Sequence, residues 1–394
     1  MTTSTVACRH FPLNPMDNVM PRYYANWILT FGLSTAVSFT EVHNLLQASL
    51  NCASEELSVF RRRVFSVPLG ENCSVKGRLE AREHSDWTPQ VIFKDLSESW
   101  PEYEDLLDEG LPQDLLDGAQ LLPPVRSNWD LNNEGAAGVV VQANFIHGGL
   151  LLSVSIFHSL IDGMSSSLLF NMWAKHMRIQ QHDNRDTAEL IITPDCCDYD
   201  LIPKIWASAG NQTGSSESGS ANEHAWRLLG MLPPLSPAEL RTREAFTLDP
   251  TLTSPLPRMK TTIFYISATA LKELSNVASR EGSELVVTAN DVLMALIWRC
   301  TMRARYAVEP DNQSYTTPGV LAELDTTLDG RSLFSEQVPW AYMGTLIFIA
   351  TTRMPLSKLI SPATKLEEVA HAQQYLTIRL YGILLQLLKE RRHV

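Results

Sequence analysis

Two apolar runs in the first half of the chain predict neighbouring β-strands. Residues 138–145 and 150–157 are rich in apolar and β-branched side chains, and His147-Gly148-Gly149 separates them in the manner of a hairpin turn. Because side chains alternate along a strand, one face of the second run should carry four apolar residues, namely Leu150, Leu152, Val154 and Ile156. His158 has the same parity, so we expect it to leave the strand on that apolar face.

Helical periodicity follows these strands and returns in the second half. After Asp162-Gly163, apolar residues recur at helical spacing, at Leu168, Leu169, Met172, Trp173 and Met177. Thr288 to Asp291 forms a capping-box pattern before a second helix, whose predicted buried stripe comprises Val292, Leu293, Leu296, Ile297 and Cys300. Residues 261–266 predict a strand, residues 268–279 a short helix, and residues 363–391 a helical run that we interpret as scaffold.

A change in composition divides the chain. Residues 207–223 contain almost no large apolar side chains, and several prolines follow, so this stretch is expected to be the mobile tip of an interdomain crossover. The 394 residues also exceed the roughly 250–300 that one core supports. We therefore predict an α/β protein with an N-terminal domain at 1–195, a crossover at 196–257 and a C-terminal domain at 258–394. Both domains should contain mostly antiparallel sheets with flanking helices.

Charge and cysteine usage exclude several classes of function. There are 32 basic and 44 acidic residues, a formal charge of −12, and no basic stripe with interleaved aromatics, which argues against a nucleic-acid partner. The only basic triplet, residues 61–63, is predicted to be a solvated face rather than a phosphate site. None of the six cysteines forms a CxxC pair, so we predict no metal site and a reducing, cytoplasmic setting.

The sequence gives no sign of a membrane partner. Its N-terminus lacks a basic region followed by an apolar run, and apolar stretches such as residues 340–350 fall short of the roughly 20 residues that a spanning helix needs. We expect a soluble monomer that binds small molecules and contacts neither membrane nor nucleic acid.

One stretch suggests acid–base chemistry. Residues 157–163 read Phe-His-Ser-Leu-Ile-Asp-Gly, so His158 stands at a strand end with Asp162 four residues later. Imidazole, with an unperturbed pKa of about 6.5, can take and return a proton near neutrality. Taken alone, however, this HxxxD pattern favours a core histidine bound to a backbone carbonyl.

Other motifs change that balance. His158 to Gly163, followed by an amphipathic helix, resembles the HxxxDG motif of BAHD acyltransferases, especially the fungal branch similar to trichothecene acetyltransferases. Further segments match that branch in the same order along the chain, from residue 13 to about residue 345. They are Leu13-Asn-Pro-Met-Asp-Asn-Val-Met-Pro21, the helix from Thr288 to Trp298, Asp329-Gly-Arg331 and Tyr342-Met-Gly344.

The resemblance implies a two-domain chloramphenicol-acetyltransferase-like fold with an active-site channel between the domains. It implies transfer of an acyl group, acetyl above all, from acyl-coenzyme A to a hydroxyl or amine of a secondary metabolite, with no bound cofactor. His158 would be the general base. Asp162 would turn away from the site and anchor its loop through an arginine, for which Arg331 is the candidate. Gly163 would supply a backbone conformation that a side chain forbids.

Two departures from the family leave alternatives open. Thr345 stands where the family has Asn, and the family's D-F-G-W-G motif is absent before the end at Val394. We therefore expect a truncated chain with an incomplete C-terminal domain. The alternatives are an inactive acyltransferase-fold binding protein and a condensation-domain-like enzyme, although that family has a second His where Phe157 stands. The absence of a G-x-S-x-G motif disfavours a serine esterase.

Overall fold

The computed structural model describes residues 8–372 except 70–76, 85, 113–114, 117, 126–129, 183–190, 209–263, 279–286 and 308–318. The chain forms two compact units. Unit 1 comprises Met1–Thr213 and Ser335–Leu346, and unit 2 comprises Gly214–Phe334 and Ile347–Val394. The predicted crossover lies outside the described residues from 209 onward, and so does most of its predicted mobile tip, residues 207–223.

The larger sheet of unit 1 has the order β2-β8-β7-β5. Its strands are β2 (Tyr24–Gly32), β8 (Gly149–Phe157), β7 (Val139–Ile146) and β5 (Val91–Asp95). β8 pairs antiparallel with β2 and β7, whereas β5 runs parallel to β7. The predicted hairpin is confirmed. Gly148 has a φ of +69°, which glycine adopts without steric cost.

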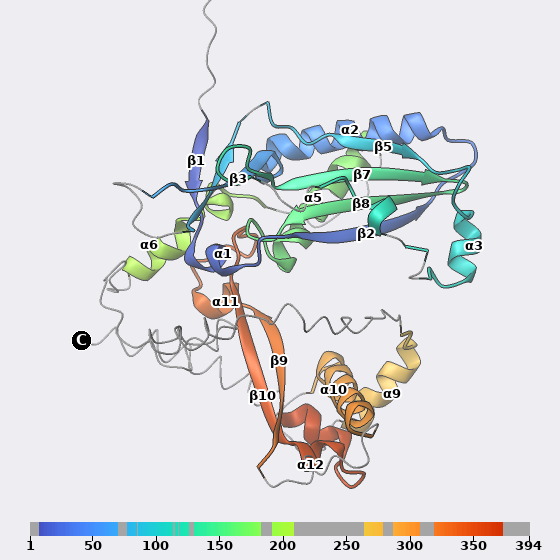
Figure 1. Cartoon of the computed structure of the whole chain (residues 1–394), viewed down its shortest axis with the longest axis vertical. Helices are drawn as coiled ribbons and strands as arrows, with labels where there is room; N and C mark the ends of the chain where they lie inside the picture. Colours follow the sequence, from blue (N-terminus) through green and yellow to red (C-terminus); the bar gives the residue numbers. More distant parts are fainter. Residues whose placement is uncertain are drawn as a thin grey trace, which may run out of the picture. The chain divides into compact units, whose positions relative to one another are not determined.

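Helices α2 (Phe39–Glu56) and α5 (Gly163–Gln180) cover one face of this sheet (Figure 1). The predicted apolar face of β8 packs into the same core as these helices, and the Trp173 indole donates a 2.9 Å hydrogen bond to the Ser49 hydroxyl. The helix predicted after Gly163 is thus confirmed. The other face packs Leu151 against α3 (Tyr103–Asp108) and α4 (Gly118–Leu121), so β8 is buried on both sides.

A second sheet of unit 1 has the order β1-β4-β3-β6. Its strands are β1 (Arg9–Pro12), β4 (Leu79–Glu83), β3 (Arg62–Ser66) and β6 (Ala136–Ala137). The predicted solvated face at residues 61–63 is wrong for Arg62, which is buried. Its guanidinium lies 3.9 Å from the ring centroid of Phe11, and its Nε lies 3.5 Å from Glu83 Oε2. A cation can be buried where a ring face and a carboxylate replace water.

Short elements complete unit 1. They are α1 (Pro15–Val19), η1 (Ser58–Arg61), η2 (Pro194–Cys197) and α6 (Leu201–Ser208). The segment Ser335–Leu346 belongs to this unit although it follows most of unit 2 in sequence. The Met343 amide donates a 2.7 Å hydrogen bond to the Cys196 carbonyl, which ties that segment to η2.

Unit 2 contains the antiparallel pair β9 (Leu321–Asp329) and β10 (Ile347–Pro355). Its helices include α9 (Ala268–Ala278), α10 (Ala289–Ala307), α11 (Arg331–Phe334) and α12 (Leu356–Ile360). The predicted capping box is confirmed, because Thr288 and Asp291 exchange backbone-to-side-chain hydrogen bonds of 2.8 and 3.2 Å. The helix predicted at residues 268–279 is confirmed by α9.

One prediction for unit 2 is wrong, and another is confirmed in part. Of the predicted strand at residues 261–266, residues 261–263 lie outside the described part, and residues 264–266 are not in a strand. Their aromatic side chains favour a strand, but propensity needs a pairing partner, and no described strand pairs with them. The predicted helical run is helical at residues 366–372, and residues 373–391 lie outside the described part.

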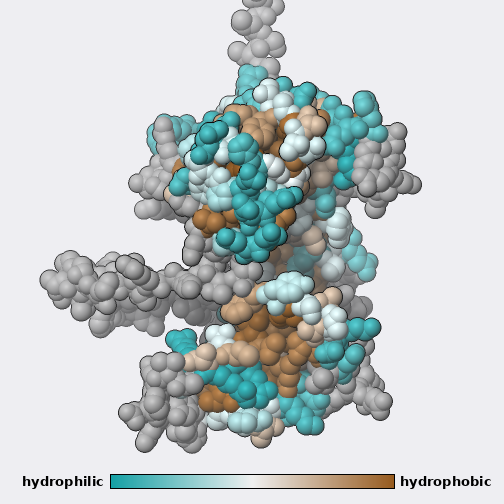
Figure 2. Space-filling view, turned by 90° about the vertical axis from the view of Figure 1, so that its right-hand side faces the viewer, coloured by the Kyte–Doolittle hydropathy of each residue, from teal (hydrophilic) through white to brown (hydrophobic). Residues whose placement is uncertain are grey.

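The buried side of α10 also differs from the prediction. Val292, Ala295 and Trp298 are buried, whereas Ile297 is 49% exposed and Cys300 is exposed. At 100° per residue the three buried positions lie on one side and Ile297 lies opposite. Figure 2 shows hydrophobic surface gathered on this unit.

Candidate active site

His158 is the first residue after β8, and the segment before β2 holds it in place. The His158 amide donates to the Tyr23 carbonyl at 2.9 Å. The Ser159 hydroxyl donates to the Met20 carbonyl, at 3.4 Å. The start of the HxxxDG loop is therefore held by hydrogen bonds to the carbonyls of residues 20–23.

The His158 ring is partly exposed and lies edge-on to the Tyr23 ring, with centroids 5.6 Å apart. Its Nδ1 is buried and has no hydrogen-bond partner among the described residues. The structure therefore shows no bond from Nδ1 to a backbone carbonyl, which is one form of the core-histidine alternative. Because Nδ1 is buried, a proton exchanged with a ligand would have to pass through the other ring nitrogen, Nε2.

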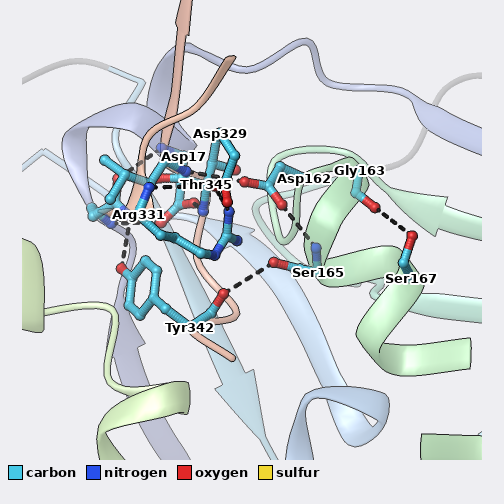
Figure 3. Close-up of polar contacts among 11 residues, drawn as sticks. Asp17, Asp162, Gly163, Ser165, Ser167, Asp329, Arg331, Tyr342 and Thr345 are labelled. Carbon is cyan, nitrogen blue, oxygen red and sulfur yellow. Dashed lines mark hydrogen bonds and ion pairs between the residues drawn. The ribbon is translucent and has the colours of Figure 1, made fainter. Parts of the chain in front are cut away.

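Asp162 ends the loop and is buried. It is the N-cap of α5, because its Oδ1 accepts the Ser165 amide at 2.9 Å. Its Oδ2 accepts the Leu346 amide at 3.1 Å. Figure 3 shows the Asp162 carboxylate and its hydrogen bond to Ser165. Asp162 therefore joins the end of the loop to the start of α5 and to the segment Ser335–Leu346.

Arg331 is the buried first residue of α11. Its Nη1 donates a 2.6 Å hydrogen bond to Asp329 Oδ1, within unit 2. Asp162 belongs to unit 1, and the anchoring pair between Asp162 and Arg331 remains a prediction.

Gly163 differs from its expected role. It is the exposed first residue of α5 and does not have a positive φ. A Cβ added to it would meet no atom within 4 Å. The expectation that a side chain is forbidden here is wrong, because the first position of a helix has an ordinary backbone conformation open to any residue.

The structure adds residues that the sequence did not assign to the site. Asp17 of α1 is fully buried, and its Oδ1 accepts the Thr345 amide at 2.6 Å. Its Oδ2 accepts the Asn14 amide at 2.9 Å. The Asn14 side-chain amide donates to the Tyr342 hydroxyl at 3.0 Å.

The Tyr342 carbonyl accepts the Ser165 hydroxyl at 3.2 Å (Figure 3). Residues 342–346 are thus held by the opening motif and by the start of α5 together. Both motifs were visible in the sequence, but no sequence signal indicated that they meet.

Burial dominates the electrostatics of Asp17. Removal from water raises its pKa well above the ordinary 3.8, although the Thr345 and Asn14 amides act in the opposite direction. Nearby Asp162 adds a smaller upward contribution. Burial therefore makes the ionised form of the Asp17 carboxyl less favourable than it would be in water.

Within the described residues, no group of three or more His, Cys, Asp or Glu side chains is placed to hold a metal ion. No described helix has the length and apolar character to cross a membrane. The site consists of His158, the loop to Asp162 and the residues that fix that loop.

Comparison with known proteins gives a consistent result. Residues 117–372 match the Transferase family, and residues 23–176 match the trichothecene 3-O-acetyltransferase-like N-terminal domain. The chain is 27% identical over 381 residues to the eremophilane O-acetyltransferase ORF8 of Penicillium roqueforti, covering 92% of this chain and 74% of that relative.

Two further likenesses concern chain length and fold. The chain is 25% identical over 389 residues to the isocyanide synthase-NRPS hybrid crmA of Aspergillus fumigatus, and the match covers 92% of this chain but only 23% of that much longer relative. The crystal structure of F. sporotrichioides TRI101 complexed with coenzyme A and T-2 superposes with a TM-score of 0.63 at 18% identity. That match covers 98% of this chain and 78% of the other, and it shows the predicted α/β fold.

Proposed function

Because the chain belongs to the Transferase family, we propose that it moves an acyl group, with acetyl expected, from acyl-coenzyme A to a hydroxyl or amine of a small molecule in secondary metabolism. The observation that carries the proposal is His158, a partly exposed histidine that directly follows β8. The family match and the O-acetyltransferase relative support it.

In the proposed reaction His158 acts as general base. It takes the proton of the acceptor hydroxyl while the oxygen attacks the thioester carbonyl carbon. The carbon–sulfur bond of the tetrahedral intermediate then breaks, and the coenzyme A sulfur leaves with the proton that His158 returns. The products are an ester and the free thiol, and no acyl-enzyme forms.

The other motif residues have structural roles in this proposal. Asp162 holds the loop through the Ser165 and Leu346 amides, and the pair with Arg331 stays a prediction. Ser159 is not assigned as a nucleophile, because its buried hydroxyl donates to the Met20 carbonyl. The proposal needs no bound cofactor and no metal.

The proposal also covers the location, oligomeric state and partners of the protein. We expect a cytoplasmic monomer whose partners are acyl-coenzyme A and the acceptor, without nucleic acid or membrane. The acidic charge of −12 and the absence of CxxC pairs support this, since a nucleic-acid partner needs a basic surface.

The test is to incubate the chain with acetyl-coenzyme A and a panel of hydroxylated terpenoids while measuring release of free thiol. His158→Ala should lower turnover by about 10²–10⁴-fold without changing the melting temperature. His176→Ala is the matched control, because that ring pairs with Glu56 at 2.9 Å and should leave turnover intact. Equal turnover in His158→Ala and the parent protein would refute the assignment.

The NRPS hybrid relative favours a second candidate, in which the acyl donor is a thioester on a carrier protein. Under that alternative, acetyl-coenzyme A gives no thiol release while an acylated phosphopantetheine carrier does. An inactive binding protein would release thiol from neither donor.

A further inference from the structure

Two buried carboxylates accept hydrogen bonds from consecutive backbone amides in the segment Ser335–Leu346. Asp17 accepts the Thr345 amide, and Asp162 accepts the Leu346 amide. Asp162 lies four residues after His158, whereas Asp17 lies in the opening motif, to which the proposed reaction assigns no role. The two carboxylates accept from neighbouring peptide units, so a shift of either carboxylate displaces the amide that donates to the other.

The helix that carries Asp17, α1, is also followed directly by residues 20–23, whose carbonyls accept hydrogen bonds from the His158 loop. The Met20 amide caps α1 by donating to the Asp17 carbonyl. Met20 in turn accepts the Ser159 hydroxyl, and Tyr23 accepts the His158 amide. Asp17 is therefore connected to the His158 loop by two routes, one through residues 20–23 and one through Thr345, Leu346 and Asp162.

The chemistry of position 17 explains why a carboxylate stands there. Each of its oxygens accepts one backbone amide, that of Thr345 or that of Asn14. An asparagine has only one acceptor oxygen, so it would leave one of those buried amides unsatisfied. Two fixed donors thus require two acceptor oxygens, even though burial makes the ionised form costly.

We propose that Asp17 is a positioning residue for the transfer reaction: through the Thr345 amide it fixes residues 342–346 against Asp162 and thereby holds the His158 loop in its working orientation. The inference rests on the proposed function for its kinetic part only. Its structural part, the coupling between Asp17 and the loop, is independent of what the protein transfers.

The experiment compares Asp17→Asn with Glu83→Gln, both in the full chain. Glu83 is a matched control because it is another nearly buried carboxylate of unit 1. It pairs with Arg62 and Arg9 and has no described hydrogen bond to residues 342–346. Both variants should lose thermal stability. Only Asp17→Asn should lower kcat, by up to about 10²-fold as expected for a misplaced catalytic group, with KM for acetyl-coenzyme A changed less than about twofold.

Hydrogen–deuterium exchange separates this inference from the proposed function. In Asp17→Asn, peptides covering residues 340–347 and 158–167 should both exchange faster, and in Glu83→Gln neither should. Faster exchange at 340–347 alone, or an unchanged kcat in Asp17→Asn, would overturn the positioning role. If the parent protein shows no turnover, the proposed function fails while the exchange data still decide the coupling.

Discussion

Gly344 lies directly against the ring of Tyr342, where a Cβ atom would overlap the Tyr342 hydroxyl oxygen. That hydroxyl accepts the Asn14 side-chain amide, so the ring cannot move aside without breaking a buried hydrogen bond. The substitution Gly344→Ala should lower the free energy of unfolding by about 1–3 kcal/mol, as overpacking does. Urea denaturation followed by circular dichroism measures this, and a midpoint equal to that of the parent protein would contradict it.

Gly163→Ala should behave in the opposite way. A Cβ there would meet nothing within 4 Å, so the unfolding free energy should change by no more than about 0.5 kcal/mol. Turnover is the informative measurement. Glycine permits close approach of a ligand to the backbone, so turnover that falls while stability stays constant would show that substrate passes over the start of α5. A variant that fails to fold would contradict the geometry described above.

Asp162→Asn should reduce stability, because an asparagine leaves either the Ser165 or the Leu346 amide without an acceptor. A buried unsatisfied donor costs about 1–3 kcal/mol. Asp130→Asn is the control, since that exposed carboxylate also accepts a backbone amide, that of Asn132, at 2.9 Å. If Asp162→Asn melts like the parent protein but has lost turnover, Asp162 takes part in the chemistry and its structural role is wrong.

The buried Asp17 predicts a dependence of stability on pH. Its folded pKa is raised above the ordinary 3.8 by burial, so the folded state binds the proton more tightly than the unfolded state. Its contribution to stability is then complete below 3.8 and is lost as pH rises through the folded pKa. The difference in unfolding free energy between the parent protein and Asp17→Asn should therefore grow as pH falls from neutral toward 3.8. A difference independent of pH would contradict the raised pKa.

The sequence predicted those parts of the fold that depend on local pattern. The β7–β8 hairpin followed from alternation and from the glycine at 148, and α5 followed from helical spacing after Asp162. The position of His158 at a strand end followed from the same reasoning. These features involve residues close together in the chain, so periodicity and turn chemistry are sufficient to predict them.

Features that depend on distant residues were missed. Asp17 and Thr345 are separated by 328 residues, and neither segment has a pattern that specifies the other. Arg62 was placed on a solvated face because its neighbours are basic, whereas its burial depends on Phe11 and Glu83. At α10 the periodicity was correct, but which side faced the core depended on packing that the helix sequence alone does not contain.

The return of residues 335–346 to unit 1 has a consequence for synthesis of the protein on the ribosome. Asp17 is made 328 residues before its partner Thr345. At about 5–20 residues per second, translation leaves the Asp17 carboxylate without this partner for roughly 15–65 seconds. Unit 1 can form its β2-β8-β7-β5 sheet during that time, since those strands all precede residue 158. The loop that carries His158 acquires its hydrogen bond to the Leu346 amide only after that residue has been made.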